Sequence, residues 1–153
     1  MQIQKQTVDG IQVSFPSKLC EVNQACDLLQ GFLDKRKNVS DLFLILLALR
    51  EAFTNAVIHG NKKNTELLVS AIVEIHDDQL VAVIRDQGPG FAWRSHTWEL
   101  PNPKSESGRG LAIIQSCFEN IEFNTSGNEI TLRKQLGNYS ANSNRTRGWS
   151  GLP

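Results

Sequence analysis

The sequence predicts an α/β two-layer sandwich, a mixed and mostly antiparallel sheet with helices packed on one face. Two long segments carry apolar residues at helical spacing, and shorter segments rich in Val, Ile and Leu are separated by turn residues. A chain of 153 residues is long enough for one ordinary core and too short for two comfortable domains. We therefore expect a single domain.

The first elements are a strand and an amphipathic helix. Residues 11–15 alternate between apolar and polar side chains and end at Pro16, which predicts a short, half-buried strand. Ser17 has the character of an N-cap, and apolar residues then recur at helical spacing over residues 19–33. This segment is predicted to be the first helix.

A second helix is predicted to cross the middle of the domain. Ser40 or Asp41 caps it, and its first half, LFLILLAL, is apolar on every side, as in a helix buried among other elements. It should run to about His59 and stop at Gly60.

Two hairpins are predicted after this helix. Residues 66–75 and 80–84 are rich in β-branched residues and flank a polar loop, and residues 121–123 and 130–132 flank Ser-Gly-Asn. Between the hairpins, a Gly- and Pro-rich connection over residues 86–110 has the composition of a functional lid.

The C-terminal part adds one more helix and a tail. Apolar residues at helical spacing predict a helix over residues 111–118. We expect the ordered domain to cover residues 1–136 and the Asn-, Ser- and Gly-rich residues 137–153 to form a flexible polar tail.

Composition excludes several classes of protein. Lys plus Arg equals Asp plus Glu at 16 each, with no block of like charges, so we expect neither direct nucleic-acid binding nor a membrane surface. The three cysteines have no metal-binding spacing and lie in apolar segments, which favours a reducing, cytoplasmic location. No signal peptide is expected, and the longest uninterrupted apolar run is about half of the ~18 residues that span a bilayer.

The second helix acquires a polar stripe near its end. Glu51 and Asn55 lie four residues apart and so share one helix face. By itself, such a face also fits a helix that simply reaches solvent.

Two glycine motifs follow. Asp86 begins Asp-Gln-Gly-Pro-Gly-Phe directly after a predicted strand, where glycines let the backbone approach a ligand. Residues 107–111, Ser-Gly-Arg-Gly-Leu, open a helix whose amide groups and dipole suit a phosphate, although this motif alone also fits an ordinary loop.

In this order, the three motifs resemble the N, G1 and G2 boxes of the gyrase/histidine-kinase/mismatch-repair-type (GHKL) ATPase superfamily, over nearly all of residues 5–136. The segments EAFTNAVIHGNK and SESGRGLAII are most similar to the bacterial anti-sigma-factor serine/threonine protein kinases. The resemblance implies a Bergerat-type, histidine-kinase-like ATP-binding domain that uses ATP and Mg²⁺.

The resemblance assigns roles to the polar residues of these motifs. Asp86 would accept a hydrogen bond from the adenine amino group, its alternative role being a turn cap. Asn55 would offer its side-chain oxygen to Mg²⁺, or bond to backbone instead. Glu51 is the catalytic candidate that would orient or deprotonate the attacking hydroxyl, unless it forms a surface salt bridge.

The glycines and their neighbours receive roles in the same way. Gly88 and Gly90 would pass close to the nucleotide, and Gly108 and Gly110 would let the lid fold over the phosphates. Arg109 could add positive charge there or remain solvated.

Three further residues belong to the resemblance. Leu111 completes the Gly-Xxx-Gly-Leu motif and is counted with the nucleotide-binding residues. Thr131 would support the adenine site through its hydroxyl, although threonine is also a good strand former. His59 matches the family's His-Gly ending but is left out of the catalytic set, because a histidine at a helix end is more often a cap.

The function implied is transfer of the ATP γ-phosphate to a serine or threonine of a regulatory partner, an anti-sigma-factor antagonist, with a sigma factor as a second partner. One alternative is a nucleotide-dependent module that sequesters such a regulator without significant kinase activity, and another is a unit of a larger phosphatase or response-regulator protein. The chain contains no histidine followed by the pattern of a phosphoacceptor helix, which argues against a self-phosphorylating sensor kinase. Relatives often form homodimers, and the sequence leaves that choice open.

Overall fold

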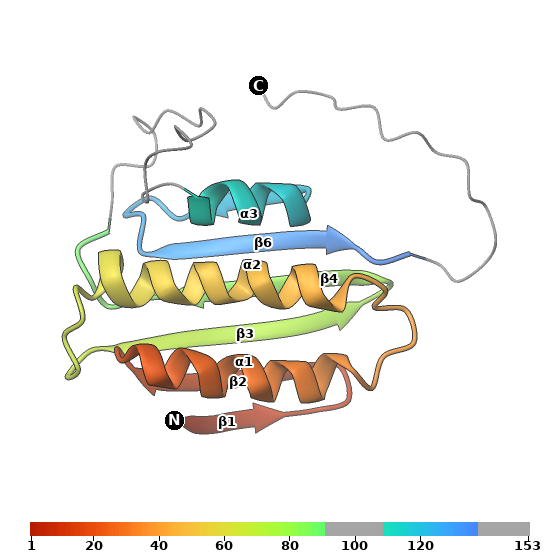
Figure 1. The fold of residues 1–153 in the computed structure, drawn as a ribbon, viewed down its shortest axis with the longest axis horizontal. Helices are drawn as coiled ribbons and strands as arrows, with labels where there is room; N and C mark the ends of the chain where they lie inside the picture. Colours follow the sequence, from red (N-terminus) through yellow and green to blue (C-terminus); the bar gives the residue numbers. More distant parts are fainter. Residues whose placement is uncertain (91–108, 138–153) are drawn as a thin grey trace.

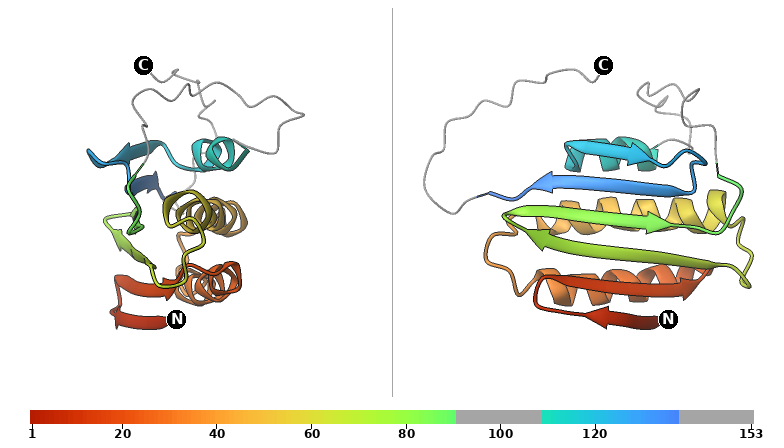
Figure 2. Two further views of the ribbon diagram at one scale, coloured as in Figure 1. Left: turned by 90° about the vertical axis from the view of Figure 1, so that its left-hand side faces the viewer. Right: turned by 180° about the vertical axis from the view of Figure 1, so that it is seen from behind.

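The computed structural model describes residues 1–90 and 109–137, which form one sheet with helices on a single face (Figures 1 and 2). In chain order the elements are β1 (Gln2–Gln6), β2 (Gly10–Pro16), α1 (Leu19–Leu33), α2 (Leu42–Asn55), the π-helical turn η1 (Ala56–Gly60), β3 (Leu68–His76), β4 (Gln79–Arg85), α3 (Arg109–Cys117), β5 (Asn120–Phe123) and β6 (Glu129–Gln135). The two-layer sandwich is confirmed.

The sheet has six strands in the order β1-β2-β3-β4-β6-β5. Every pairing among the described strands is antiparallel, so the expectation of a mixed sheet was wrong on that point. Both predicted hairpins, β3–β4 and β5–β6, are confirmed. The strand β6 lies beside β4, and β5 is at the edge of the sheet. Because Arg85 pairs with Glu129, the turn between β5 and β6 lies next to the C-terminal end of β4.

The core lies between the sheet and the helices. Alternate residues of β2, β3, β4 and β6 are buried on this side, as the period of two requires. Phe15 of β2 meets Phe53 of α2 edge to face, with ring centroids 5.5 Å apart and both side chains fully buried. This contact between large side chains fixes α2 to the sheet. We call α2 and η1 together the central helix.

The segment Leu42–Gly60, formed by α2 and η1, has 19 residues and a mean hydropathy of 1.5, which by length and composition is enough to cross a membrane. No such helix was expected from the sequence, because the apolar residues of this segment are interrupted by polar ones after Leu49. In the fold this helix lies between α1 and α3 on the sheet (Figure 1), and Ile45, Leu49 and Phe53 are fully buried within the domain. These contacts are those of a core helix.

The last turn of the central helix is wider than an α-helical turn. The backbone N–H of Asn61 donates to the carbonyl of Ala56 at 2.8 Å, a π-type bond that spans five residues. The predicted end at Gly60 is confirmed, but its π geometry had not been foreseen.

The predicted helix caps need correction. Ser17 is not an N-cap, because α1 begins after Lys18 and has no side-chain cap bond. Asp41 does precede α2, again without a side-chain cap bond. The hydroxyl of Ser17 donates instead to the carbonyl of Leu67 at 2.9 Å and accepts from the amide of Asn61 at 2.8 Å. The Ser17 hydroxyl therefore forms tertiary hydrogen bonds and does not cap α1.

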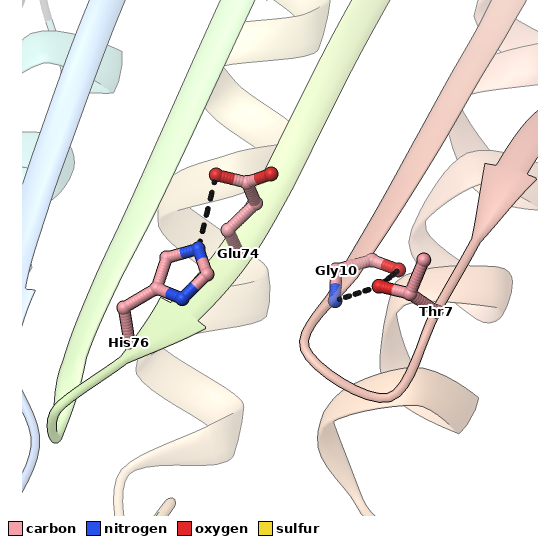
Figure 3. A network of polar contacts seen from close by, with 4 residues as sticks. All are labelled: Thr7, Gly10, Glu74 and His76. Carbon is pink, nitrogen blue, oxygen red and sulfur yellow. Dashed lines mark hydrogen bonds and ion pairs between the residues drawn. The ribbon is translucent and has the colours of Figure 1, made fainter.

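The strand β1 was missed. Its five residues, QIQKQ, are all exposed, so it lacks the half-buried alternation that reveals a strand. Figure 3 shows polar contacts at the end of the sheet where β1 turns into β2. There the N–H of Gly10 donates to Oγ1 of Thr7 at 3.0 Å, and Nε2 of His76 lies 3.3 Å from Oε2 of Glu74. The β3–β4 turn is here as well, and its two central residues both have positive φ, as in a two-residue hairpin.

Candidate functional site

A cavity of about 340 Å³ opens at the other end of the sheet, between the end of the central helix, the start of α3 and the two hairpins. This volume falls within the range of about 300–1,000 Å³ found for small-molecule sites. The cavity is lined by Ala52, Asn55, Ala56, His59, Gly60, Ile84, Asp86, Gly90, Gly110, Leu111, Ile114, Phe123, Gly127, Asn128, Glu129 and Ile130. It is mostly apolar, with a few polar groups that could orient a ligand.

Asp86 begins a turn whose backbone is held by three successive hydrogen bonds. The N–H of Asp86 donates to the carbonyl of Asn128 at 2.9 Å, and the N–H of Gln87 donates to Oδ1 of Asn61 at 2.8 Å. The N–H of Gly88 donates to Oδ1 of Asp86 itself at 2.8 Å. We call residues 86–88 the recognition turn. Asp86 is only 8% exposed, and its carboxyl group is held by the Gly88 N–H before any ligand arrives.

The recognition turn fits against the end of the central helix through glycines. A side-chain carbon on Gly60 would overlap all three atoms of the Asp86 carboxyl group, and one on Gly88 would overlap the carbonyl of Gly60. Gly90, with φ of +83°, lies against the carbonyl of Ser126 in the same way. The Asp86 side chain at Gly60 and backbone atoms at Gly88 and Gly90 thus occupy the space that a larger residue would need.

At the other side of the cavity, α3 begins against the polar stripe of α2. A side-chain carbon on Gly110 would lie 2.7 Å from Oε2 of Glu51 and 3.6 Å from Oδ1 of Asn55. The fold thus brings together Glu51, Asn55 and the first turn of α3. The dipole of α3 places partial positive charge at this point, where an anion would be stabilised.

Burial changes the acidity of Asp86. Desolvation raises the pKa of its carboxyl group above the ordinary value, and the hydrogen bond from the Gly88 N–H lowers it by a smaller amount. The charged form is therefore held at a cost, which is relieved when a ligand donates a hydrogen bond to it.

Most of the predicted residues lie at the cavity. Asn55, Asp86, Gly90, Gly110 and Leu111 line it directly. Gly88 supports it through Gly60, and Glu51 lies beside Gly110.

Three other predicted residues are not among those that line the cavity. Gly108 and the lid lie outside the described residues. Arg109 is the first residue of α3, and its side chain is exposed. The structure does not bring Thr131 to the cavity, because it lies between Ile130 and Leu132, which are buried on the helix side, so its side chain is on the opposite face. Asn128 and Glu129 lie at the cavity instead.

Several site residues were missed by the sequence analysis. Asn61 stood inside the quoted motif without a role, and a signal for it was available: it is a polar residue directly after a helix-ending glycine. Asn124 accepts three backbone N–H bonds through Oδ1, which shapes the β5–β6 turn that presents Asn128. Its Asn-Xxx-Ser-Gly pattern is typical of a turn, but its place beside the recognition turn depends on the sheet order.

A divalent cation has few protein ligands available here. The described residues contain no group of three or more His, Cys, Asp or Glu side chains able to hold a metal ion. Asn55 supplies an amide oxygen at the cavity, next to the Glu51 carboxylate. Such a donor set fits Mg²⁺ that binds mainly through a nucleotide's phosphates and water.

Comparison with known proteins agrees with this geometry. Residues 15–134 match the family described as the histidine kinase-like ATPase domain. The serine-protein kinase RsbW of Staphylococcus epidermidis is 30% identical over 152 residues, which cover 92% of this chain and 96% of that protein. The anti-sigma F factors of Priestia megaterium and Bacillus subtilis are each 29% identical, over 67% of this chain and 76% and 75% of those proteins. The chain therefore belongs to the histidine kinase-like ATPase domain family, within the group of RsbW-like kinases and anti-sigma factors.

Proposed function

We propose that this protein binds ATP and transfers its γ-phosphate to a serine or threonine of a regulatory partner, an anti-sigma-factor antagonist. The observation that carries the proposal is the placement of two separate polar groups around one apolar cavity, one against Gly60 and one against Gly110. Asp86 lies at one side, and Glu51 with Asn55 and the start of α3 lies at the other. A nucleotide has matching parts, a base with an amino group and a chain of phosphates.

The base is recognised by Asp86. Its carboxylate accepts hydrogen bonds and donates none, so it pairs with the amino group of adenine and repels the carbonyl that guanine carries at the same position. The apolar lining from Ile84, Ile114 and Phe123 surrounds the flat faces of the ring. We expect the protein to prefer adenine nucleotides for this reason.

The phosphates occupy the opposite side. The first amides of α3 and its dipole stabilise their negative charge. Asn55 would hold Mg²⁺ through its side-chain oxygen, and the ion would neutralise charge on the phosphates. Gly110 lets α3 approach Glu51 without a side chain between them.

Glu51 acts on the nucleophile. Its carboxylate accepts the proton of the partner's serine or threonine hydroxyl as the hydroxyl oxygen bonds to the γ-phosphorus. The bond from that phosphorus to the bridging oxygen breaks, and ADP leaves with the electron pair. Glu51 is partly exposed, so a partner side chain can reach it.

The experiment combines nucleotide titration with phosphate transfer. Calorimetry with ATP, ADP and GTP, with and without Mg²⁺, measures binding by the wild type, Asp86→Asn and Glu51→Gln. Radiolabelled ATP and a candidate antagonist measure transfer, with Glu66→Gln as a control carboxylate on an exposed segment. We expect binding to be lost in Asp86→Asn and transfer to be lost in Glu51→Gln. Absence of ATP binding by the wild type would overturn the proposal.

A second candidate is a nucleotide-dependent module that sequesters a sigma factor without significant transfer. Its support is that several relatives are named anti-sigma F factor. In that case ATP binds, the partner is retained in a complex, and Glu51→Gln behaves like the wild type. Measurement of transfer with Glu51→Gln therefore separates the two functions.

A further inference from the structure

We infer that Asn61 is a positioning residue that fixes the recognition turn, and through it the choice of adenine over guanine, without itself lining the cavity. This inference rests on the proposed binding of ATP. Asn61 is only 2% exposed, and it is absent from the residues that line the cavity. Any effect on the ligand must pass through the residues that it holds.

Asn61 uses its whole side chain. Its Nδ2 group donates to Oγ of Ser17 at 2.8 Å and to the carbonyl of Leu68 at 3.0 Å. Its Oδ1 accepts from the backbone N–H of Gln87 at 2.8 Å. One buried amide therefore joins the ends of β2 and the central helix, the start of β3 and the recognition turn.

The bond to Gln87 is the one that matters for recognition. Gln87 lies between Asp86, which reads the base, and Gly88, which bonds back to the Asp86 carboxyl group. The side chain of Gln87 accepts from the N–H of Leu68 at 2.6 Å, so the same turn is tied to β3 a second time. The two ties belong to one ring of hydrogen bonds, because Asn61 also donates to the carbonyl of Leu68, and of the two only the first bonds the backbone of the turn.

The backbone of Asn61 contributes as well. Its N–H closes the π-helical turn on Ala56, which sets the position of Gly60 against the Asp86 carboxyl group. The side chain of Asn61 thus bonds to the recognition turn directly, and its main chain acts through Gly60, which lies against the turn. A separate bond runs from the Asp86 N–H to the carbonyl of Asn128. Removal of the Asn61 side chain leaves this bond in place and takes away the one that holds the Gln87 N–H.

The test measures base discrimination as well as affinity. The variants are Asn61→Ala and Asn61→Asp, which keeps the acceptor for Gln87 and loses the amide donor. Ser17→Ala removes a neighbouring bond of the network but not the one to Gln87, and Asn64→Ala removes an exposed asparagine of the same connection. Calorimetric titration with ATP and GTP gives the dissociation constants and the fraction of active protein.

We expect Asn61→Ala to weaken ATP binding about tenfold, the effect of one lost hydrogen bond to a buried partner, and to weaken GTP binding much less. Asn61→Asp should retain more of the ATP-to-GTP ratio than Asn61→Ala, even where it is less stable to urea. Ser17→Ala and Asn64→Ala should leave the ratio unchanged. A purely structural role predicts a smaller active fraction with an unchanged ratio, and that result would overturn the inference.

Hydrogen exchange of the wild type provides a measurement that does not depend on folding of the variants. The Gln87 amide should exchange slowly without nucleotide, because it is bonded to Asn61. Exchange at the rate of an unprotected amide contradicts the inference. If the wild type binds no ATP, the proposed function fails instead, and the two failures are distinguishable because the exchange measurement needs no ligand.

Discussion

Gly60 lies directly against the carboxyl group of Asp86, so that the end of the central helix and the recognition turn share a surface with no side chain between them. Substitution Gly60→Ala places a methyl group where the carboxyl atoms now lie, and Asp86 must move. We expect ATP affinity to fall by about tenfold or more, the scale of one lost hydrogen bond to a charged group. Calorimetric titration measures it, and unchanged affinity would show that Asp86 does not contact the base.

Gly31 provides a contrast within the same chain. It lies exposed in α1, and a side-chain carbon there meets no atom within 4 Å. Because alanine has the higher helix propensity, Gly31→Ala should raise the free energy of unfolding by about 0.5–1 kcal/mol. Urea denaturation measures this, with nucleotide binding unaffected. A loss of stability would contradict the assignment of Gly31 to the interior of a helix.

Gly110 controls the position of Glu51. Substitution Gly110→Ala adds a carbon 2.7 Å from Oε2 of Glu51, which displaces the carboxylate. Because small displacements at a reacting centre reduce rates on the order of 100-fold, phosphate transfer should fall by this factor. ADP affinity, which depends more on Asp86, should change by much less. Gly137→Ala is the control, since no atom lies within 4 Å of its added carbon.

Asp86→Asn should separate stability from recognition. Burial raises the pKa of the carboxyl group in the folded state, so folding disfavours the charged form. The wild type therefore gains stability from this group as the pH falls through the raised pKa, and lacks that gain at neutral pH. We expect the variant to be more stable than the wild type at pH 7, by a difference that shrinks on acidification, while ATP binding is lost. Urea denaturation at several pH values checks the sign.

Two phenylalanines of α2 should respond in opposite ways to truncation. Phe53 is fully buried against Phe15, and Phe53→Ala should lower the free energy of unfolding by about 3–5 kcal/mol. Phe43 is 80% exposed, and Phe43→Ala should change the free energy of unfolding by less than about 0.5 kcal/mol. Thermal and urea unfolding of both variants provide the comparison, and similar losses would contradict the packing of α2.

The fold was predictable where residue pattern and burial agree. The hairpin β3–β4 could be recognised because Val, Ile and Leu recur on both strands, and α2 because its apolar start leads to a helix-ending glycine. The strand β1 could not, because all five of its residues are exposed and only Ile3 among them is apolar. Ser17 was misassigned because a short hydroxyl side chain suits both a cap and a tertiary bond, and only the fold places Asn61 and Leu67 beside it.

The site was predictable to the extent that its residues belong to short motifs. Asp86, Asn55 and Gly110 are found together because the three motifs line the same cavity at one end of the sheet. Thr131 was misplaced because a shift of one residue along a strand exchanges the two faces of the sheet. Asn61 was overlooked because the burial of a polar side chain is decided by segments distant in sequence.

The π-helical turn at Ala56–Gly60 has a consequence for the spacing of the motifs along the chain. An α-helix advances by about 100° per residue, and the wider turn accommodates one residue more than an α-helical path would. Asn55 belongs to the regular part of the helix, whereas Gly60 ends the wider turn and Asn61 follows it. Removal of one residue from this turn would restore a regular helix and at the same time rotate Gly60 away from Asp86. The π-helical turn thus sets the position of Gly60 and Asp86 relative to Asn55. The number of residues in this segment is therefore constrained as well as their identity.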